Sequence, residues 1–320
     1  MTVTAPAAVP TARLSHAALP PVEPDRPPWP GEVVHVRGAE LFVRRTPGPG
    51  TGGAPAVYVH GLGGSATNWT DLAHLLAGRL SGEALDLPGF GRSGPAPRQD
   101  YSLAGHARTV IGYLELRGGE PVHLLGNSLG GAVTVLVAAL RPDLVRTLTL
   151  VSPAMPSLRP RQGSDVTLPL LMLPGLGRLV QRRLDTLPPE RRARAVLDLC
   201  FGDPSVVPAN RFAEAVEEVV RRRGVPWAMD AFTASLRGIA RSYAAPGARS
   251  LWRQAAQIQA PTLVVWGGRD KVVSAALAPR TAATIPGARL LLLPRIGHVA
   301  QMEVPEVVAR AVVALLEDAA

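Results

Sequence analysis

The sequence has very little cysteine, lysine and aromatic character. Cys200 is the single cysteine among 320 residues, so an internal disulfide is excluded. The leucines and the aspartate around Cys200 predict a buried helical face, and no base or sharp turn nearby would activate its thiol. Lys271 is the single lysine, so arginine supplies nearly all of the positive charge.

The charge balance is strongly positive, with a formal net charge of +9. A general preference for arginine and alanine is the simplest explanation, and a weak attraction to anionic or lipid surfaces or substrates is the alternative. Nucleic acid is not an expected partner, because aromatic residues make up only 4% of the chain and the longest basic run is residues 221–223. The expected partner is a small molecule.

Long apolar runs are absent as well. No uninterrupted run reaches the ~18 residues of a membrane span. The first residues lack the basic start and the continuous apolar stretch of a secretion signal. We therefore expect no integral membrane span and a cytoplasmic location. The His and Cys residues lack the spacing of metal ligands, so no metal and no organic cofactor are expected.

The chain begins with a segment rich in proline and alanine, after which strands and helices alternate. Residues 1–30, the leader, are predicted to be disordered or loosely draped, because proline cannot donate to ladders or helices. The predicted strands are 33–36 and 41–45, joined by a turn at Gly38 and Ala39, then 56–59, 84–87, 122–125, 147–151, 262–266 and 289–293. The predicted helices are 69–80, 102–116, 129–140, about 275–285 and about 305–316. This alternation predicts a mostly parallel sheet flanked by helices.

The alternation is interrupted between residues 153 and 254. This stretch has helical segments, prolines and no convincing strand, and its 16 arginines against nine acidic residues give it a net charge of +7. We therefore expect a core domain formed by residues 31–152 and 255–320, with residues 153–254 inserted as a helical cap. An apolar stretch at residues 167–180 is predicted to pack on the core edge as a cap helix, or alternatively to act as a lid for an acyl chain.

The sequence GNSLGG at residues 126–131 follows a predicted strand and opens a predicted helix. This is the setting of a nucleophile elbow, in which a strained turn pushes a serine hydroxyl out above the sheet. Gly126 and Gly130 flank Ser128 because side chains there would clash with the neighbouring strand and helix. The helix that begins at Leu129 directs unpaired amides and its positive dipole end at the same place. Ser128 is therefore a candidate nucleophile, although an ordinary glycine-rich turn has the same pattern.

A second glycine-rich loop, HGLGG at residues 60–64, comes directly after the predicted strand 56–59. An enzyme that transfers acyl groups must stabilise an oxyanion, and preorganised backbone amides are the usual means. We assign this role to the amides of Leu62 and Leu129. His60 is expected to hold the loop by hydrogen bonding rather than to transfer protons, at the edge of the substrate pocket.

Asp270 and His298 each lie on a loop after a late predicted strand, in the sequences WGGRDKVV (266–273) and RIGH (295–298). Ligand sites of open α/β sheets gather at the carboxyl ends of the strands, so both loops can meet Ser128. Taken alone, Asp270 would be a turn residue and His298 a helix cap. The order Ser128, Asp270, His298, with each residue on a loop after a strand, instead predicts a catalytic triad.

These loops, together with DLPGFGRS at residues 86–93, resemble the α/β-hydrolase superfamily over residues 31–152 and 255–320. The resemblance implies the α/β-hydrolase fold, with a mostly parallel eight-stranded sheet, and it makes residues 153–254 similar to that family's helical cap. It implies that His298 is the general base for Ser128 and that Asp270 orients the imidazole. It also implies an acyl-enzyme that water cleaves, without a metal or cofactor.

The nucleophile narrows the choice of activity. Haloalkane dehalogenases and epoxide hydrolases resemble one another in using an aspartate where this sequence has Ser128, which leaves esterases and lipases, carbon–carbon bond hydrolases and cofactor-free perhydrolases. Asn127 is similar to the carbon–carbon hydrolases that act on ring-cleavage products, but those enzymes commonly have tryptophan where this sequence has Val299. We expect a carboxylesterase with a small or acyl-chain substrate, with Asn127 and Val299 at its pocket.

Two alternatives stay open at this point. The first is a carbon–carbon bond hydrolase that acts on a vinylogous diketo acid. The second is an inactive member of the fold that serves as a binding protein, since a fold alone does not prove activity. Such a protein would be expected to lack one of the triad residues, and this sequence keeps all three.

Overall fold

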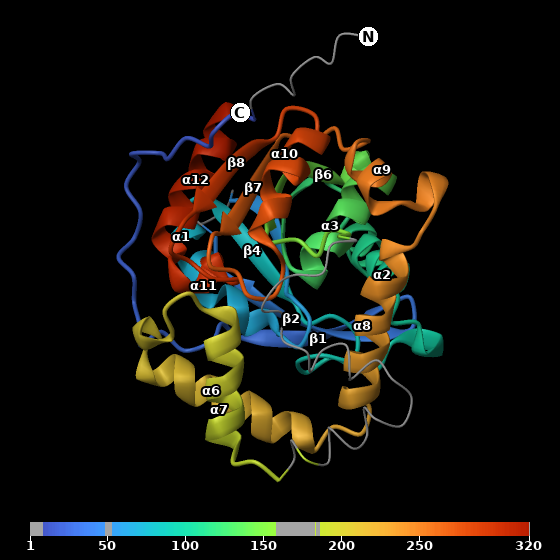
Figure 1. Cartoon of the computed structure of the whole chain (residues 1–320), viewed down its shortest axis with the longest axis vertical. Coiled ribbons are helices and arrows are strands. Elements are labelled where there is room, and N and C mark those ends of the chain that lie inside the picture. Colours follow the sequence, from blue (N-terminus) through green and yellow to red (C-terminus); the bar gives the residue numbers. More distant parts are fainter. Residues whose placement is uncertain (1–8, 49–52, 158–182, 184–185, 320) are drawn as a thin grey trace.

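The centre of the fold is an eight-stranded sheet in the order β1-β2-β4-β3-β5-β6-β7-β8 (Figure 1). The computed structural model describes residues 9–48, 53–157, 183 and 186–319. The strands are β1 (Gly31–Val36), β2 (Ala39–Thr46), β3 (Ala54–Val59), β4 (Leu80–Leu85), β5 (Val122–Asn127), β6 (Val145–Val151), β7 (Thr262–Gly267) and β8 (Arg289–Leu293). β2 is antiparallel to both of its neighbours, and every pairing from β4 to β8 is parallel. The predicted eight-stranded, mostly parallel sheet is confirmed.

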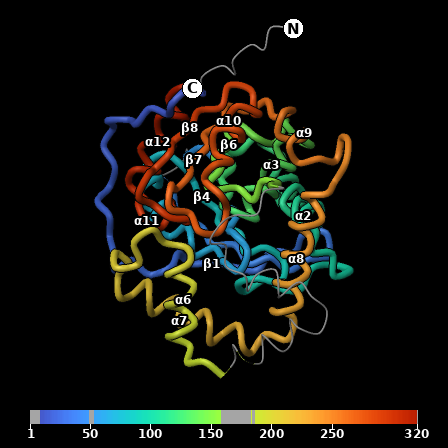
Figure 2. Tube along the Cα trace, viewed as in Figure 1, coloured from blue at the N-terminus to red at the C-terminus, as the bar shows by residue number. Residues whose placement is uncertain are grey.

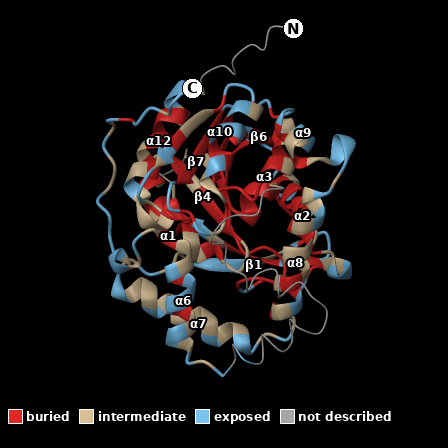
Figure 3. Ribbon diagram, viewed as in Figure 1, coloured by how far each residue is buried: buried red, intermediate tan, exposed pale blue. Residues whose placement is uncertain are grey.

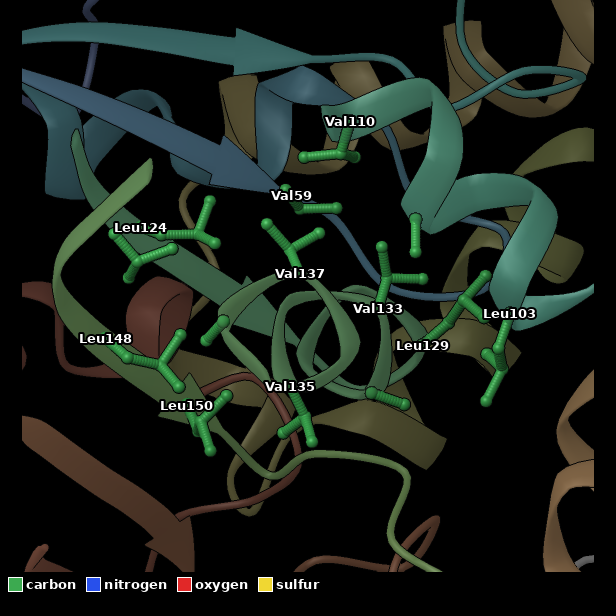
Figure 4. Packing of buried hydrophobic residues seen from close by; sticks show 14 of the residues in the cluster. Val59, Leu103, Val110, Leu124, Leu129, Val133, Val135, Val137, Leu148 and Leu150 are labelled. Atoms are coloured by element: carbon green, nitrogen blue, oxygen red, sulfur yellow. The ribbon is translucent and has the colours of Figure 1, made fainter. Parts of the chain in front are cut away.

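Helices cover both faces of this sheet and bury an apolar core on each side (Figure 3). One face carries α2 (Leu103–Leu116), α3 (Leu129–Leu140), α9 (Leu251–Ala255) and α10 (Ala278–Thr284), and the other carries α1 (Thr70–Leu76), α11 (Ala300–Glu303) and α12 (Pro305–Asp318). Figure 4 shows Leu129, Val133 and Val137 of α3 packed with Val59 of β3 and Leu124 of β5. Nearly all residues of α3 are apolar and buried, and this packing fixes the loop at the N-terminus of the helix.

Short turns of 3₁₀ helix join these elements. They are η1 (Ala66–Trp69), η2 (Pro97–Gln99), η3 (Pro142–Leu144), η4 (Pro204–Val206), η5 (Gly247–Arg249) and η6 (Ala275–Leu277). The single helix expected over residues 69–80 is wrong: α1 ends at Leu76, and Leu80 already pairs with Ala54 as the first residue of β4. The strand expected at residues 84–87 therefore starts earlier and ends at Leu85.

The hairpin between β1 and β2 turns one residue earlier than expected. Its two turn residues are Arg37 and Gly38, with φ of 48° and 83°, and Ala39 already belongs to β2. A two-residue hairpin loop of this kind requires positive φ at both positions, to match the twist of the strands. The glycine therefore takes the second position of the turn rather than the first.

We keep the name cap for residues 153–254, of which the structure describes 153–157, 183 and 186–254. This described part contains helices and no strand. Its three long helices are α6 (Pro189–Cys200), α7 (Ala209–Arg223) and α8 (Ala228–Tyr243). The imidazole of His106 on α2 hydrogen-bonds to the hydroxyl of Ser235 on α8 at 3.0 Å, and both side chains are buried. The cap is thus anchored to the core at α8. The apolar stretch at residues 167–180 lies outside the described residues.

The leader runs along the outside of the core and reaches the cap (Figure 2). Ala12 N donates to Leu290 O at 2.9 Å, and Leu290 N donates to Pro10 O at 2.8 Å, so the leader covers the edge of β8. Farther along, Arg211 of α7 donates to Arg26 O at 2.9 Å. Proline removes an amide donor but leaves its carbonyl free to accept, and Pro10 is used in this way. The expected disorder therefore does not hold for residues 9–30; residues 1–8 lie outside the described part.

Candidate active site

Ser128 occupies a sharp turn between β5 and α3. Its φ of 53° and ψ of −116° lie outside the helical region, and such strained backbone clusters at functional sites. Glycine is required on both sides, because a Cβ at Gly126 would lie 2.5 Å from Thr134 Oγ1 and one at Gly130 would lie 2.2 Å from Val59 O. The residues that surround Ser128 therefore form the predicted elbow geometry.

Asp270 and His298 meet beyond the carboxyl ends of β7 and β8. His298 Nδ1 lies 2.8 Å from Asp270 Oδ2, and the two residues are 4% and 0% exposed. The other carboxylate oxygen, Asp270 Oδ1, accepts from the amides of Val272 at 2.8 Å and Val273 at 2.9 Å. Since the carboxylate can only accept, Nδ1 of His298 carries the proton and Nε2 is left as the basic nitrogen.

The pKa of Asp270 reflects these contacts. Burial alone would raise it, but the charge of His298 and its hydrogen bond, together with the two backbone amides, hold the pKa below its usual range. Asp270 therefore stays ionised near neutral pH and acts as a fixed acceptor for the imidazole.

Asn127 joins the elbow to the loop of His298. Its Nδ2 donates to His298 O at 3.2 Å and to Val151 O at 3.0 Å. Among the described residues, the Ser128 hydroxyl makes no hydrogen bond with the His298 ring. In free enzymes this bond is often long and tightens only when substrate binds. The structure thus brings Asp270 and His298 into direct contact, and the His298 backbone next to the elbow.

The amides of Leu62 and Leu129 are both available to an oxyanion. No described protein atom accepts a hydrogen bond from either amide. Gly61 lets the two loops approach each other, since a Cβ there would lie 3.1 Å from the Cβ of Ser128. The loop itself is closed by a hydrogen bond from Gly64 N to Gly61 O at 3.0 Å. This arrangement fits the predicted oxyanion hole.

His60, Asn127 and Val299, which the sequence predicts at the substrate pocket, are all buried. His60 is 0% exposed; its Nδ1 donates to Gly61 O at 2.7 Å and its Nε2 accepts from Leu87 N at 2.9 Å. Burial lowers the pKa of His60 to about 4, so it stays neutral. Asn127 is committed to backbone carbonyls, and Val299 is buried in one cluster with Leu197 and Phe201 of the cap.

Three polar residues around the site were not singled out in the sequence. Asp86 accepts from the amides of Ala66 at 2.6 Å and Arg92 at 2.7 Å, and burial raises its pKa to about 6. Arg222 of the cap donates to Gly63 O in the oxyanion loop and pairs with Glu218, while Glu303 accepts from the amide of Gly297, directly before His298. Asp86 could have been found in the motif DLPGFGRS; nothing in the sequence marks the other two as part of the site.

Within the described residues, no group of three His, Cys, Asp or Glu side chains is arranged to hold a metal ion. The same part of the chain contains no helix that is long and apolar enough to cross a membrane. Burial raises the pKa of the Cys200 thiol to about 12, which leaves it without nucleophilic character.

A mostly parallel sheet in this strand order, with a serine elbow after β5 and an Asp–His pair after β7 and β8, is the architecture of an α/β hydrolase. A family model described as "alpha/beta hydrolase fold" matches residues 55–305. The chain therefore belongs to the α/β-hydrolase family, as the sequence predicted.

Three similar proteins show the range of the family. The chain is 33% identical over 267 residues to the dihydrolipoyllysine-residue acetyltransferase component of an acetoin cleaving system from Pseudomonas putida, and the match covers 83% of this chain but only 64% of that protein. It is 28% identical to 2-hydroxy-6-oxononadienedioate/2-hydroxy-6-oxononatrienedioate hydrolase 2 from the same species, covering 84% of this chain and 89% of the relative. A crystal structure of a membrane phospholipase A superposes with a TM-score of 0.70 at 27% identity, covering 91% of this chain and 86% of the other.

Proposed function

We propose that this protein is a serine hydrolase that cleaves a carboxylic ester of a small or acyl-chain substrate through an acyl-enzyme. The observation that carries the proposal is the buried pair of Asp270 and His298, held at 2.8 Å beside a serine on a strained elbow. The similarity to a membrane phospholipase A supports an acyl-chain substrate.

In this mechanism, the Asp270–His298 pair activates Ser128 once substrate binds. Asp270 holds Nδ1–H of His298, so Nε2 accepts the proton of the Ser128 hydroxyl while the oxygen attacks the ester carbonyl. The amides of Leu62 and Leu129 bind the oxyanion that forms. His298 then gives the proton to the leaving alcohol, and afterwards activates the water that releases the acid. Ser128 is regenerated at the end of the cycle.

A fluorophosphonate probe tests this proposal on the intact protein. We expect one covalent adduct by intact mass, located by peptide mapping on Ser128, because the probe reacts with serines activated by a base and an oxyanion hole. A protein without adduct, or an adduct on another residue, would contradict the proposed nucleophile.

A carbon–carbon bond hydrolase is the second candidate, favoured by the relative that shares 28% identity over most of both chains and whose name describes a dicarboxylate substrate. An anionic substrate needs an uncommitted cation in the site. Arg222 of the cap reaches the oxyanion loop, but its guanidinium already donates to Gly63 O. It also pairs with Glu218, with 3.1 Å between Nη2 and Oε1. Among the described residues, this commitment of Arg222 favours the ester substrate.

The two candidates are separated by a paired assay. One arm measures turnover of nitrophenyl esters of increasing acyl length, and the other measures turnover of a vinylogous diketo acid. We expect kcat/KM for the best ester to exceed that for the diketo acid by at least about tenfold, a difference of about 1.4 kcal/mol in the transition state. Turnover of the diketo acid alone would reverse the ranking.

A further inference from the structure

The end of cap helix α6 lies directly against the loop that carries His298 (Figure 1). We call residues 198–203 the α6 end and residues 294–299 the histidine loop. His298 N donates to Cys200 O at 2.6 Å. A Cβ at Gly202 would lie 2.4 Å from Arg295 O, and one at Gly297 would lie 2.4 Å from Cys200 O. The two backbones are therefore in contact with no room for side chains between them.

Glu303 on α11 binds both of these segments with one carboxylate. Its Oε2 accepts from Gly297 N at 2.8 Å and from Gly202 N at 3.0 Å, and its Oε1 accepts from Asp203 N at 3.0 Å. Hydrogen bonds to an ionised carboxylate are about twice as strong as those between neutral groups. Glu303 thus fixes the peptide that precedes His298 to the α6 end of the cap.

The same α6 end is tied to the loop of Asp270. Lys271, the residue after Asp270, donates from Nζ to Asp198 O at 2.6 Å. Val299 of the histidine loop is also buried in one apolar cluster with Leu197 and Phe201 of the cap. The α6 end is therefore held against both loops, and Glu303 supplies three of the bonds.

We propose that Glu303 is a positioning residue: by binding the histidine loop and the α6 end together, its carboxylate sets where His298 lies between Asp270 and Ser128. The inference rests on the proposed function. Asp270 fixes Nδ1 of the ring, but the ring can pivot about that bond unless the backbone is also held. Glu303 holds that backbone one residue before His298. A displacement of about 1 Å at a reacting group costs about 100-fold in rate, so the support has a catalytic effect.

Glu303→Gln and Glu303→Ala test the proposal, with Glu306→Gln as the matched control. Glutamine keeps the size of the side chain but offers an NH2 group where the carboxylate accepts, and alanine removes all three bonds. Glu306 is exposed and, among the described residues, forms its ion pair with Arg310, at 3.0 Å. We expect kcat for a nitrophenyl ester to fall about tenfold in Glu303→Gln and about 100-fold in Glu303→Ala, with KM changed less than about threefold. Glu306→Gln should match the unaltered protein.

A second measurement separates positioning from general stability. The proton between His298 Nδ1 and Asp270 Oδ2 is expected to give a far-downfield proton NMR signal in the unaltered protein and in Glu306→Gln. It should shift or broaden in Glu303→Gln, measured well below the melting temperature of each variant. Gly202→Ala, which separates the two backbones from the cap side, is expected to give the same change in the signal and in kcat.

The proposal is overturned if the folded Glu303 variants keep the kcat and the NMR signal of the unaltered protein, even when their melting temperature is lower. Glu303→Gln and Gly202→Ala decide the question where Glu303→Ala does not fold. A failure of the proposed function has a different signature, since the unaltered protein would then not react with the fluorophosphonate probe at all.

Discussion

Replacing Ser128 with alanine is expected to lower the kcat for ester hydrolysis about 10⁶-fold, because the serine, histidine and aspartate of such a site act as one unit. A residual acceleration of about 10³-fold over water should persist, since the amides of Leu62 and Leu129 still stabilise the oxyanion. The measurement is steady-state turnover of an activated ester, with the melting temperature as a check on folding.

Ser152→Ala is the matched control for this experiment. Ser152 follows β6 as Ser128 follows β5, has a φ of 43°, and is buried without a hydrogen-bond partner for its hydroxyl among the described residues. The two substitutions thus remove the same group from two positions that both have positive φ. We expect Ser152→Ala to keep kcat within about twofold, and equal losses in the two variants would refute a nucleophilic role for Ser128.

Asp270→Asn is expected to lower kcat about 10⁴-fold with little change in KM. The amides of Val272 and Val273 donate to one oxygen of Asp270. In the asparagine variant the side-chain oxygen takes that position, so the side-chain NH2 group faces His298. That NH2 group donates, so Nδ1 of His298 must accept and its proton moves to Nε2. Nε2 can then no longer take the proton of Ser128.

Asp143→Asn controls for the same change of charge at an exposed position in η3, where the carboxylate pairs with Arg141 at 2.6 Å. It should leave kcat unchanged. An Asp270→Asn variant that remains folded and loses less than about tenfold in kcat would show that Asp270 does not set the tautomer of His298.

The positions of residues on loops that come after strands could be predicted from the sequence. Ser128, Asp270 and His298 each lie on the loop that follows an apolar strand, and parallel strands bring such loops to one edge of the sheet. The glycines around Ser128 were predictable for the same reason, because a close approach of backbones excludes every other residue. Local pattern and topology therefore sufficed for the fold and for the three residues of the proposed triad.

Contacts between distant segments were not predictable in this way. Glu303 and Gly202 are 101 residues apart in the sequence. A single glutamate in an amphipathic stretch also has the same sequence pattern as any surface acid. The hydrogen bonds of His60 and Asn127 were not predictable for a related reason. Their side chains form hydrogen bonds with backbone groups of Leu87, Val151 and His298, which come close only in the folded chain.

The contact between the leader and α12 has a consequence for the order in which the chain folds. Ser15 donates to Glu317, 302 residues away, and its amide donates to Arg310 O. On the ribosome the leader emerges before the sheet, whereas its partners on α12 are made after all eight strands and after the other described helices. The part of the leader around Ser15 must therefore stay undocked through most of synthesis, and a nascent chain that is resistant to proteases over the core should still be cleaved near that residue. Protection of that segment marks the completion of α12.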